Sequence, residues 1–374
     1  MTSSFVEKLR KTEFPTLNTM VYLNNASTGI MPQRTVKAVG EYLQSRVAAK
    51  GDFEKTLATF DIIRSNLAKL LGGTREEYGF VPNTSTGLNT FANGLDYPKD
   101  SNIVICDLEF PANYIPWQYI AKRNNIELKV VRSQQGAVSD DDFLNAIDEN
   151  TSVVAISLVQ FSSGYVPNIE MLADAVHEMG GFIAVDIIQA AGWKDIDLQE
   201  MGVDFATAQA AKWLIGPIGA GFLFLRKELL DIVTPAYLGW WGVKNMEDFG
   251  YAMRKPLDDA RRFEVGSPAM MAYVGFLKSL DLLLDIPSRK REEAALEVSD
   301  YLRTCLDESD IEYYRFEERN RSPIVSCKPS HVEMLHNSLL KENIHCSVRN
   351  GRLRVSPHFY NTKDDIDLLM EQMR

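Results

Sequence analysis

The sequence has few of the residues that build metal sites or disulfide frameworks. Its 374 residues include five histidines and four cysteines, and no two cysteines form a CxxC pair. Such scattered cysteines argue against a zinc site or a disulfide-stapled fold and are typical of reduced, mostly buried thiols. We therefore expect no metal ion and a cytoplasmic location. The cysteines are Cys106, Cys305, Cys327 and Cys346.

Long apolar runs and an excess of positive charge are also missing. No stretch approaches 18 consecutive apolar residues, and the first residues, MTSSFVEK, lack the apolar core of a signal peptide. The formal net charge is −11, which disfavours nucleic acid or an anionic membrane as the main partner. We expect neither kind of partner.

What is present is the alternation of an α/β protein. The chain is 45% hydrophobic, and from about residue 24 to residue 267 apolar strand-like runs alternate with helical patterns. Strands are predicted at 78–81, 102–107, 128–132, 152–160, 182–186, 205–208 and 221–225. Helices are predicted at 62–71, 85–94, 113–123, 169–179 and 198–201. This pattern predicts a mostly parallel sheet sandwiched by helices.

The length suits two lobes. After a long amphipathic helix at 269–286, shorter helices and strands alternate to the end of the sequence. We predict a large domain of residues 16–268 and a smaller α+β domain formed by residues 1–15 and 269–374.

Two charged residues stand out at positions where sheets bind ligands. Asp186 ends the apolar run 182–185, and the carboxyl end of a buried parallel strand is where open α/β sheets place their ligands. Lys212 lies among apolar residues in QAAKWLIGP, and a lysine in such surroundings can lose its proton and form a Schiff base. Alone, either residue has an ordinary explanation, a helix cap for Asp186 and a surface charge for Lys212. Together they supply the acid and the amine that pyridoxal phosphate (PLP) requires.

Two further strand ends carry residues suited to the same cofactor. Thr84 and Ser85 open the helix after the strand 78–81, and a helix start binds phosphate through its free N–H groups. A plain helix cap is the alternative. Phe110 follows the strand 102–107, and its ring can stack on a heteroaromatic ring or belong to the core.

These segments resemble the class V aminotransferase family of fold-type I PLP enzymes. That family includes cysteine desulfurases, selenocysteine lyases, kynureninases and isopenicillin N epimerases. The resemblance runs from residues 22–27 (YLNNAS) to residues 360–367 (YNTKDDID), nearly the whole chain. Its sharpest motifs are DIIQ at 186–189, KWLIGP at 212–217, RFEVGSP at 262–268 and RVS at 354–356. It implies the fold-type I transferase fold, with a large PLP-binding α/β domain and a small α+β domain.

The resemblance also implies how the cofactor ring is held. Lys212 would form the Schiff base with PLP, and Asp186 would pair with the pyridinium nitrogen. Gln189 would contact the ring hydroxyl, and Phe110 would stack on the ring.

Other residues are implied at the phosphate. Thr84 and Ser85 match its ligands, and Ser267 matches a residue that reaches the phosphate of the neighbouring subunit. This last match implies a homodimer with shared active sites. Gln209 stands where desulfurases begin a Ser-x-His motif before the lysine, and its amide is expected to replace one of the two lost contacts.

An amino-acid substrate follows from Arg354. It matches the arginine that clamps the substrate carboxylate, and a guanidinium fork fits a carboxylate with two hydrogen bonds. Asn25 lies in the N-terminal segment that the family places near the substrate.

Departures from the family pattern bear on the reaction. Cysteine desulfurases carry a histidine where this chain has Phe110. They also place a nucleophilic cysteine on a mobile loop, whereas Cys346 lies only eight residues before Arg354 in a strand-like pattern. The pair Val159–Gln160 resembles the epimerase and kynureninase branches more closely. We therefore expect Cys346 to be structural and persulfide chemistry to be disfavoured.

The sequence thus predicts a PLP-dependent enzyme that acts at the α-carbon of an amino acid, as an aminotransferase or an isopenicillin N epimerase-like enzyme. The alternatives are a cysteine desulfurase or selenocysteine lyase, a kynureninase-like C–C lyase, and a PLP-binding protein without turnover. Epimerisation needs a second acid, for which Tyr114 and His358 are candidates. Candidate pocket walls are Tyr237, Trp240 and Trp241.

Overall fold

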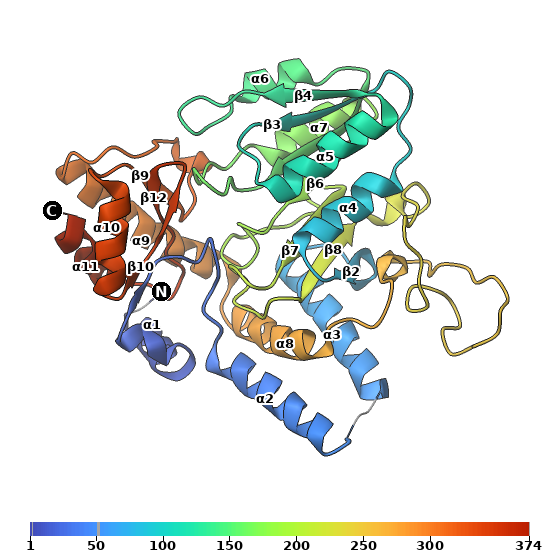
Figure 1. Cartoon of the computed structure of the whole chain (residues 1–374), viewed down its shortest axis with the longest axis horizontal. Helices are drawn as coiled ribbons and strands as arrows, with labels where there is room; N and C mark the ends of the chain where they lie inside the picture. Colours follow the sequence, from blue (N-terminus) through green and yellow to red (C-terminus); the bar gives the residue numbers. More distant parts are fainter. Residues whose placement is uncertain (2, 51–52, 374) are drawn as a thin grey trace.

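A seven-stranded, mostly parallel sheet lies at the centre of the described part of the chain, residues 1, 3–50 and 53–373 of the computed structural model (Figure 1). Strand β8 is antiparallel to its neighbours β2 and β7, and the other neighbouring pairs are parallel. In spatial order the strands are β2 (Tyr78–Val81), β8 (Gly221–Leu225), β7 (Phe205–Gln209), β6 (Phe182–Asp186), β5 (Thr151–Ser157), β3 (Asn102–Cys106) and β4 (Glu127–Val131). The predicted strands are therefore all present.

Helices cover both faces of this sheet, because its central strands are apolar on both sides. One face packs against α4 (Thr84–Gly94) and α5 (Pro111–Asn124), through residues such as Phe91 and Trp117. The opposite face packs against α3 (Phe53–Leu71), α7 (Ile169–Glu178) and α8 (Met270–Leu284). The predicted α/β class is confirmed.

A third apolar cluster joins the C-terminal elements to the N-terminal strand. It contains the antiparallel sheet β11–β12–β9 and helices that pack on it. Strand β1 (Val21–Tyr22) pairs in parallel with β10 (Ile344–His345), so a segment near the start of the chain lies beside its end (Figure 1). The other elements are β9 (Val325–Cys327), β11 (Ser347–Arg349), β12 (Arg352–Val355), α9 (Ser288–Glu308), α10 (Val332–Lys341) and α11 (Lys363–Met373). This is the α+β portion that the sequence predicts; the domain limits of 16–268, 1–15 and 269–374 stay a prediction, and Thr2 and Arg374 lie outside the described residues.

The structure corrects some local predictions. Residues 198–201 are not a helix but a single turn, because Asp197 Oδ1 accepts the N–H groups of Gln199 and Glu200 and Gly202 then turns the chain at φ +68°. The strand predicted at 152–160 ends at Ser157. Three helices were not predicted, namely α1 (Ser3–Glu13), α2 (Gln33–Val47) and α6 (Asp140–Ala146). Among the described residues, every helix is too short or too polar to span a lipid bilayer.

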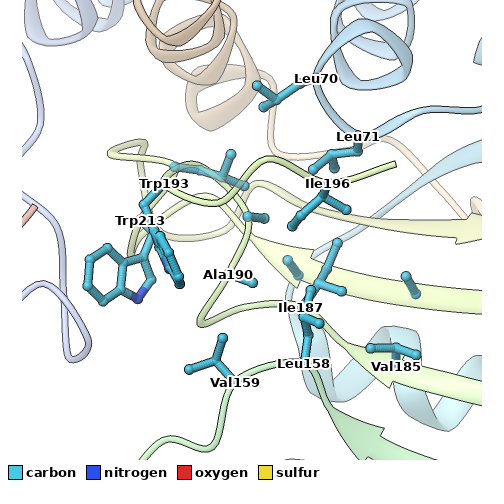
Figure 2. Packing of buried hydrophobic residues seen from close by; sticks show 14 of the residues in the cluster. Leu70, Leu71, Leu158, Val159, Val185, Ile187, Ala190, Trp193, Ile196 and Trp213 are labelled. Atoms are coloured by element: carbon cyan, nitrogen blue, oxygen red, sulfur yellow. The ribbon is translucent and has the colours of Figure 1, made fainter. Parts of the chain in front are cut away.

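The loops after β6 and β7 are anchored in the core. Figure 2 shows Ile187 and Ala190 from the first loop near Leu158 and Val159, with Trp193 and Trp213 close together. The two indole rings are 6.0 Å apart. Because these loops are packed rather than free, the residues that they carry at the end of the sheet have fixed positions.

Candidate active site

Four strand ends bring the predicted cofactor residues to one edge of the sheet. Asp186 is the last residue of β6, and Lys212 follows β7 in the connection to β8. Phe110 follows β3, and Thr84 follows β2. Strands β2, β3, β6 and β7 all run in the same direction, so these residues meet at the carboxyl end of the sheet, where such folds bind ligands.

The backbone at Lys212 is held tightly from two directions. The Ile215 N–H donates to the Lys212 carbonyl at 2.9 Å, and Ile215 takes a left-handed φ of +50° to complete the turn. From the other side the Gly29 N–H donates to the Ala211 carbonyl at 2.9 Å. A Cβ on Gly29 would lie 2.1 Å from the Lys212 carbonyl oxygen, so only glycine allows this approach. The backbone from which the lysine side chain extends is therefore fixed in position.

Burial shifts the pKa values of Lys212 and Asp186 so that each group favours its neutral form. Burial lowers the pKa of Lys212; the Asp186 charge opposes this shift, and the charges of Arg354 and Arg349 add to it. Burial raises the pKa of Asp186, an effect that the Ile188 N–H, 2.9 Å from Oδ1, partly offsets. Both shifts favour the neutral form of the group. A buried lysine with a lowered pKa is a better nucleophile at neutral pH.

Phe110 presents an aromatic face to Lys212. It is the residue before α5, and its side chain is 43% exposed. The Lys212 Nζ lies 5.6 Å from its ring centroid, and Phe161 packs against it edge-to-face with centroids 5.1 Å apart. An exposed ring beside a reactive amine is suited to stack on a planar ligand bound there.

The start of α4 has the features of a phosphate site. The Thr84 hydroxyl is buried without a hydrogen-bond partner, and Asn83 caps the helix by accepting the Thr86 N–H at 2.9 Å. The N–H groups of Thr84 and Ser85 have no acceptor within the helix, as at any helix start. An orphaned buried hydroxyl beside free N–H groups suits an anion. Ser85 is exposed at the same end.

Gln189 ties this region to the N-terminal segment. Its Nε2 donates to the Ala26 carbonyl at 3.0 Å, and its Oε1 accepts the indole N–H of Trp213 at 2.7 Å. Asn25 is similarly engaged, since its Nδ2 donates to the Ser356 carbonyl at 2.9 Å and its Oδ1 accepts the Tyr360 hydroxyl. Both amides therefore position the chain around Lys212; the direct contacts with cofactor and substrate stay predictions.

Arg354 is a buried cation held by neutral groups. Its side chain is on β12, and the residue is 2% exposed. Its Nη2 donates to the Ser27 hydroxyl at 2.6 Å and its Nη1 to the Phe161 carbonyl at 2.7 Å. No carboxylate of the described residues lies within 4.0 Å of its guanidinium group, and burial with the nearby Arg349 lowers its pKa to about 9. Such a group is suited to receive an anion from outside the protein.

Two residues near this arginine were not singled out from the sequence. Ser27 accepts hydrogen bonds from Arg354 and, at 3.3 Å, from Arg349 Nη2. Ser27 ends the stretch 22–27 that carries the family resemblance, whereas Arg349 lies outside the motifs that carry it, and no local pattern indicates which side chains point inward. Ser27 is 327 positions from Arg354 and 322 positions from Arg349 along the chain, so pairing of this kind is not visible in one sequence.

Ser267 and Gln209 lie nearer the surface. Ser267 is exposed and lines a cavity of about 430 Å³ together with Thr86 and Tyr237. Gln209 is half-buried at the end of β7. Their proposed contacts with phosphate stay predictions.

Several other candidates take part in packing. His358 is buried, its Nε2 faces the Trp213 carbonyl at 2.9 Å, its Nδ1 accepts the Phe359 N–H at 2.8 Å, and burial lowers its pKa to about 3. Both ring nitrogens are engaged, so His358 is not suited to be a second acid. Trp241 is 3% exposed in the core, whereas Tyr237 and Trp240 are exposed.

Cys346 has the surroundings of a structural residue. It lies between β10 and β11 and is 3% exposed, and burial raises the pKa of its thiol to about 12. A thiolate, not a thiol, is the nucleophile in sulfur chemistry. These surroundings are the opposite of those that activate a cysteine.

Comparison with known proteins gives one family across nearly the whole chain. The model of the aminotransferase class-V family matches residues 21–369. A Bacillus subtilis protein described as the uncharacterized aminotransferase YcbU is 28% identical over 360 residues, covering 94% of this chain and 93% of that protein. A probable cysteine desulfurase of Methanothermobacter thermautotrophicus is 26% identical and covers 96% of each chain.

Solved structures share the fold. The apo structure of a cysteine desulfurase from Thermococcus onnurineus NA1 superposes with a TM-score of 0.90 at 23% identity, covering 98% of this chain and 96% of that chain. The cystine C–S lyase C-DES, solved with its product cysteine persulfide, has a TM-score of 0.87 at 22% identity, covering 96% and 99%. At these identities the likeness concerns the fold.

Proposed function

This chain belongs to the aminotransferase class-V family of PLP-dependent enzymes, and we propose that it acts at the α-carbon of an amino acid, as an aminotransferase or an epimerase. The observation that carries the proposal is the arrangement around Lys212. A buried amine with a lowered pKa lies near a buried carboxylate, Asp186, and near a buried guanidinium, Arg354, that has only neutral partners. Binding an amino acid needs a place for its carboxylate beside the reacting amine.

The residues present fit PLP. Lys212 would bind the cofactor's aldehyde carbon, Asp186 its pyridine nitrogen and Phe110 the face of its ring. The orphaned Thr84 hydroxyl and the start of α4, with Ser85, would hold the phosphate. The chemistry that PLP supplies when bound is an electron-withdrawing ring that weakens the bonds at the substrate α-carbon. In our proposal Gln189, Gln209 and a neighbouring subunit's Ser267 complete this site.

The chain's own groups then have separate tasks. Arg354 holds the substrate carboxylate, and Ser27 with the Phe161 carbonyl fixes the guanidinium plane, so that the α-carbon is presented at one orientation. The Lys212 amine accepts the α-proton, for which its lowered pKa suits it. Asp186 keeps a proton on the ring nitrogen. Asn25 maintains the N-terminal segment that carries Ser27.

A second candidate function is cysteine desulfurase, because several curated relatives carry that description. The surroundings of Cys346 argue against it. The remaining cysteines are Cys106 and Cys327, both buried, and the half-buried Cys305 on α9. We propose that sulfur transfer to a protein thiol is not the reaction of this enzyme.

The test is an absorbance screen of the purified holoenzyme against L- and D-amino acids, with products identified by mass spectrometry. We expect spectral changes with amino acids, and a keto acid or the opposite enantiomer as product. Release of sulfide from cysteine that is lost in Cys346→Ser would favour the desulfurase instead. If no amino acid changes the spectrum, the remaining interpretation is a protein that binds the cofactor without turnover.

We also propose a homodimer and a reducing, cytoplasmic setting. The exposed Ser267 lines a cavity of about 430 Å³ together with Tyr237, and the side chains of Tyr237 and Trp240 are exposed. Exposed aromatic residues are enriched at interfaces. No disulfide joins the cysteines of the described residues, and thiols of this kind suit a reducing compartment. Sedimentation velocity tests the dimer, and a monomer with full cofactor occupancy would contradict the shared site.

A further inference from the structure

A second arginine lies beside Arg354, the proposed carboxylate site. Arg349 is the last residue of β11, directly opposite Arg352 across a hairpin that turns at Asn350 and Gly351. The short hairpin brings its guanidinium group back toward the N-terminal segment, where it shares the Ser27 hydroxyl with Arg354. Two cations therefore flank one neutral oxygen.

Arg349 has no anionic partner in the described part of the chain. Its Nη1 donates to the Val348 carbonyl at 2.7 Å and its Nη2 to Ser27 at 3.3 Å, and no described carboxylate lies within 4.0 Å. Arg352, across the same hairpin, differs: it pairs with Glu312 at 2.7 Å and stacks on Tyr314 at 4.0 Å. The protein therefore neutralises one arginine of the hairpin and leaves the other open.

Arg349 also faces open space. It lines two cavities, of about 320 and 640 Å³, and Asn350 is the other residue that both share. Two carboxylates line these cavities, Asp107 in the smaller and Glu333 in the larger, but neither reaches Arg349; Asp107 lies 3.6 Å from Arg132 instead. The neutral donors of the smaller cavity include Ser162 and Ser163. There is thus polar room for a ligand group beside this cation.

The charges around Lys212 leave room for two anions. Lys212, Arg354 and Arg349 are close enough for both arginines to disfavour the charged lysine, and Asp186 is the carboxylate that acts on it in return. One substrate carboxylate would satisfy Arg354 and leave Arg349 uncompensated. A guanidinium fork without a partner is matched by a second carboxylate.

We propose that Arg349 is a substrate-binding residue that receives a side-chain carboxylate, so that this enzyme prefers an acidic amino acid. The inference rests on the function proposed above and narrows its substrate class. Arg354 takes the α-carboxylate and Arg349 the distal one, with the two held in fixed relation by Ser27.

The test compares isosteric pairs that differ in one charge. Spectral titration of the holoenzyme with glutamate and glutamine, and with aspartate and asparagine, gives the dissociation constant for each. We expect the acid to bind about tenfold more tightly than its amide, the effect of one charge-assisted hydrogen-bonded pair. Arg349→Gln should abolish this preference and leave glutamine binding within about twofold of the wild type. Arg349→Lys, which keeps the charge, should retain part of it.

Matched controls separate this role from others. Arg319→Gln removes the same charge from an exposed side chain outside both cavities and should leave the preference unchanged. An equal loss for glutamate and glutamine in Arg349→Gln would mean that Arg349 serves the α-carboxylate and would overturn the proposal. So would an unchanged preference for glutamate. Thermal melts of both variants report any loss of folding.

Calorimetry with glutarate and butyrate distinguishes this inference from the proposed function. These ligands lack an amino group, so their binding does not depend on cofactor chemistry. Suppose that glutarate binds, that its binding requires Arg349, and that no amino acid changes the spectrum. This result would contradict the proposed function and would support a carboxylate-binding role of Arg349. A response to amino acids without any acid preference would support the function and overturn the inference.

Discussion

Two buried arginines in this protein have opposite surroundings. Arg64, on α3, donates to Glu264 at 2.6 Å and lies 4.4 Å from the ring of Phe80. Arg354, on β12, is as deeply buried but donates to a hydroxyl and a carbonyl. The first is neutralised inside the fold, whereas the second keeps its charge uncompensated.

The difference separates a structural cation from a binding cation. Taking a charge out of water is costly, and a partner with good geometry offsets that cost. Glu264 does this for Arg64 and also accepts the Phe80 N–H at 3.0 Å, so the pair locks α3 to the edge strand β2. For Arg354 the cost of burying the charge is offset only when a ligand carboxylate binds. The same residue type thus supports stability in one place and recognition in the other.

The largest expected effect concerns Lys212, the amine near which Arg354 would hold the substrate carboxylate. Lys212→Ala should remove covalent cofactor attachment and all turnover, because no other described lysine lies beside Asp186. Borohydride reduction followed by mass spectrometry should find the cofactor on Lys212 in the wild type and on no lysine in the variant. Lys194→Ala, which removes a lysine paired with Glu292, is the control. Attachment that survives in Lys212→Ala would contradict the assignment.

Replacing each arginine by methionine should change the free energy of unfolding differently at the two sites. Arg64→Met leaves Glu264 buried without its partner and should lower the free energy of unfolding by about 3–5 kcal/mol. Arg354→Met removes a buried charge that has no carboxylate partner and should be neutral or stabilising. Urea unfolding of the apoenzyme measures both. Equal destabilisation by the two variants would break the comparison.

For amino-acid binding, in contrast to stability, a change at Arg354 should have a larger effect than a change at the Arg64–Glu264 pair. Arg354→Gln should weaken amino-acid binding by about 30-fold or more, since loss of one partner from a buried ion pair costs about 2–5 kcal/mol. Glu264→Gln, which changes a carboxylate that pairs with Arg64 and not with Arg354, should leave the dissociation constant within about twofold. Spectral titration of the holoenzymes gives these values.

The smallest effect is a shift in the pKa of Lys212. Its pKa is lowered by burial and by Arg354 and Arg349, so replacing either arginine by glutamine should raise it and move the reactivity of the amine to higher pH, by less than about one pH unit. Asp186→Asn should move it to lower pH, because that carboxylate raises the lysine pKa. The pH dependence of labelling of the apoenzyme by an amine-reactive reagent checks both signs. A shift of the same sign in all variants would refute the electrostatic explanation.

The elements that carry the site were readable from local sequence patterns. Strands β6 and β8 have the predicted bounds, because an apolar run between polar or glycine residues specifies a buried strand by itself. Asp186 ends one such strand and Lys212 comes shortly after another, so both could be picked out from the sequence. The turn at 198–201 was mistaken for a helix because its apolar spacing fits one turn, and the stop imposed by Gly202 depends on a backbone angle that the pattern does not reveal.

The rest depends on contacts between distant parts of the chain. Ser27 and Arg354 are 327 positions apart, and a single sequence does not show that they meet. Arg349 and Arg352 belong to the same hairpin and are the same residue type, yet one pairs with Glu312 and the other is open. Their difference appears only when the surrounding carboxylates are placed in space. The open arginine was missed for this reason.

The most direct test of the central claim, that Arg354 is kept unpaired for the substrate carboxylate, compares alanine with its decarboxylated analogue ethylamine. In the wild-type holoenzyme alanine should perturb the cofactor spectrum at concentrations at least about 30-fold below those that ethylamine requires. In Arg354→Gln the two ligands should bind alike. A preference for alanine that persists in the variant would show that another group receives the carboxylate and would contradict the account.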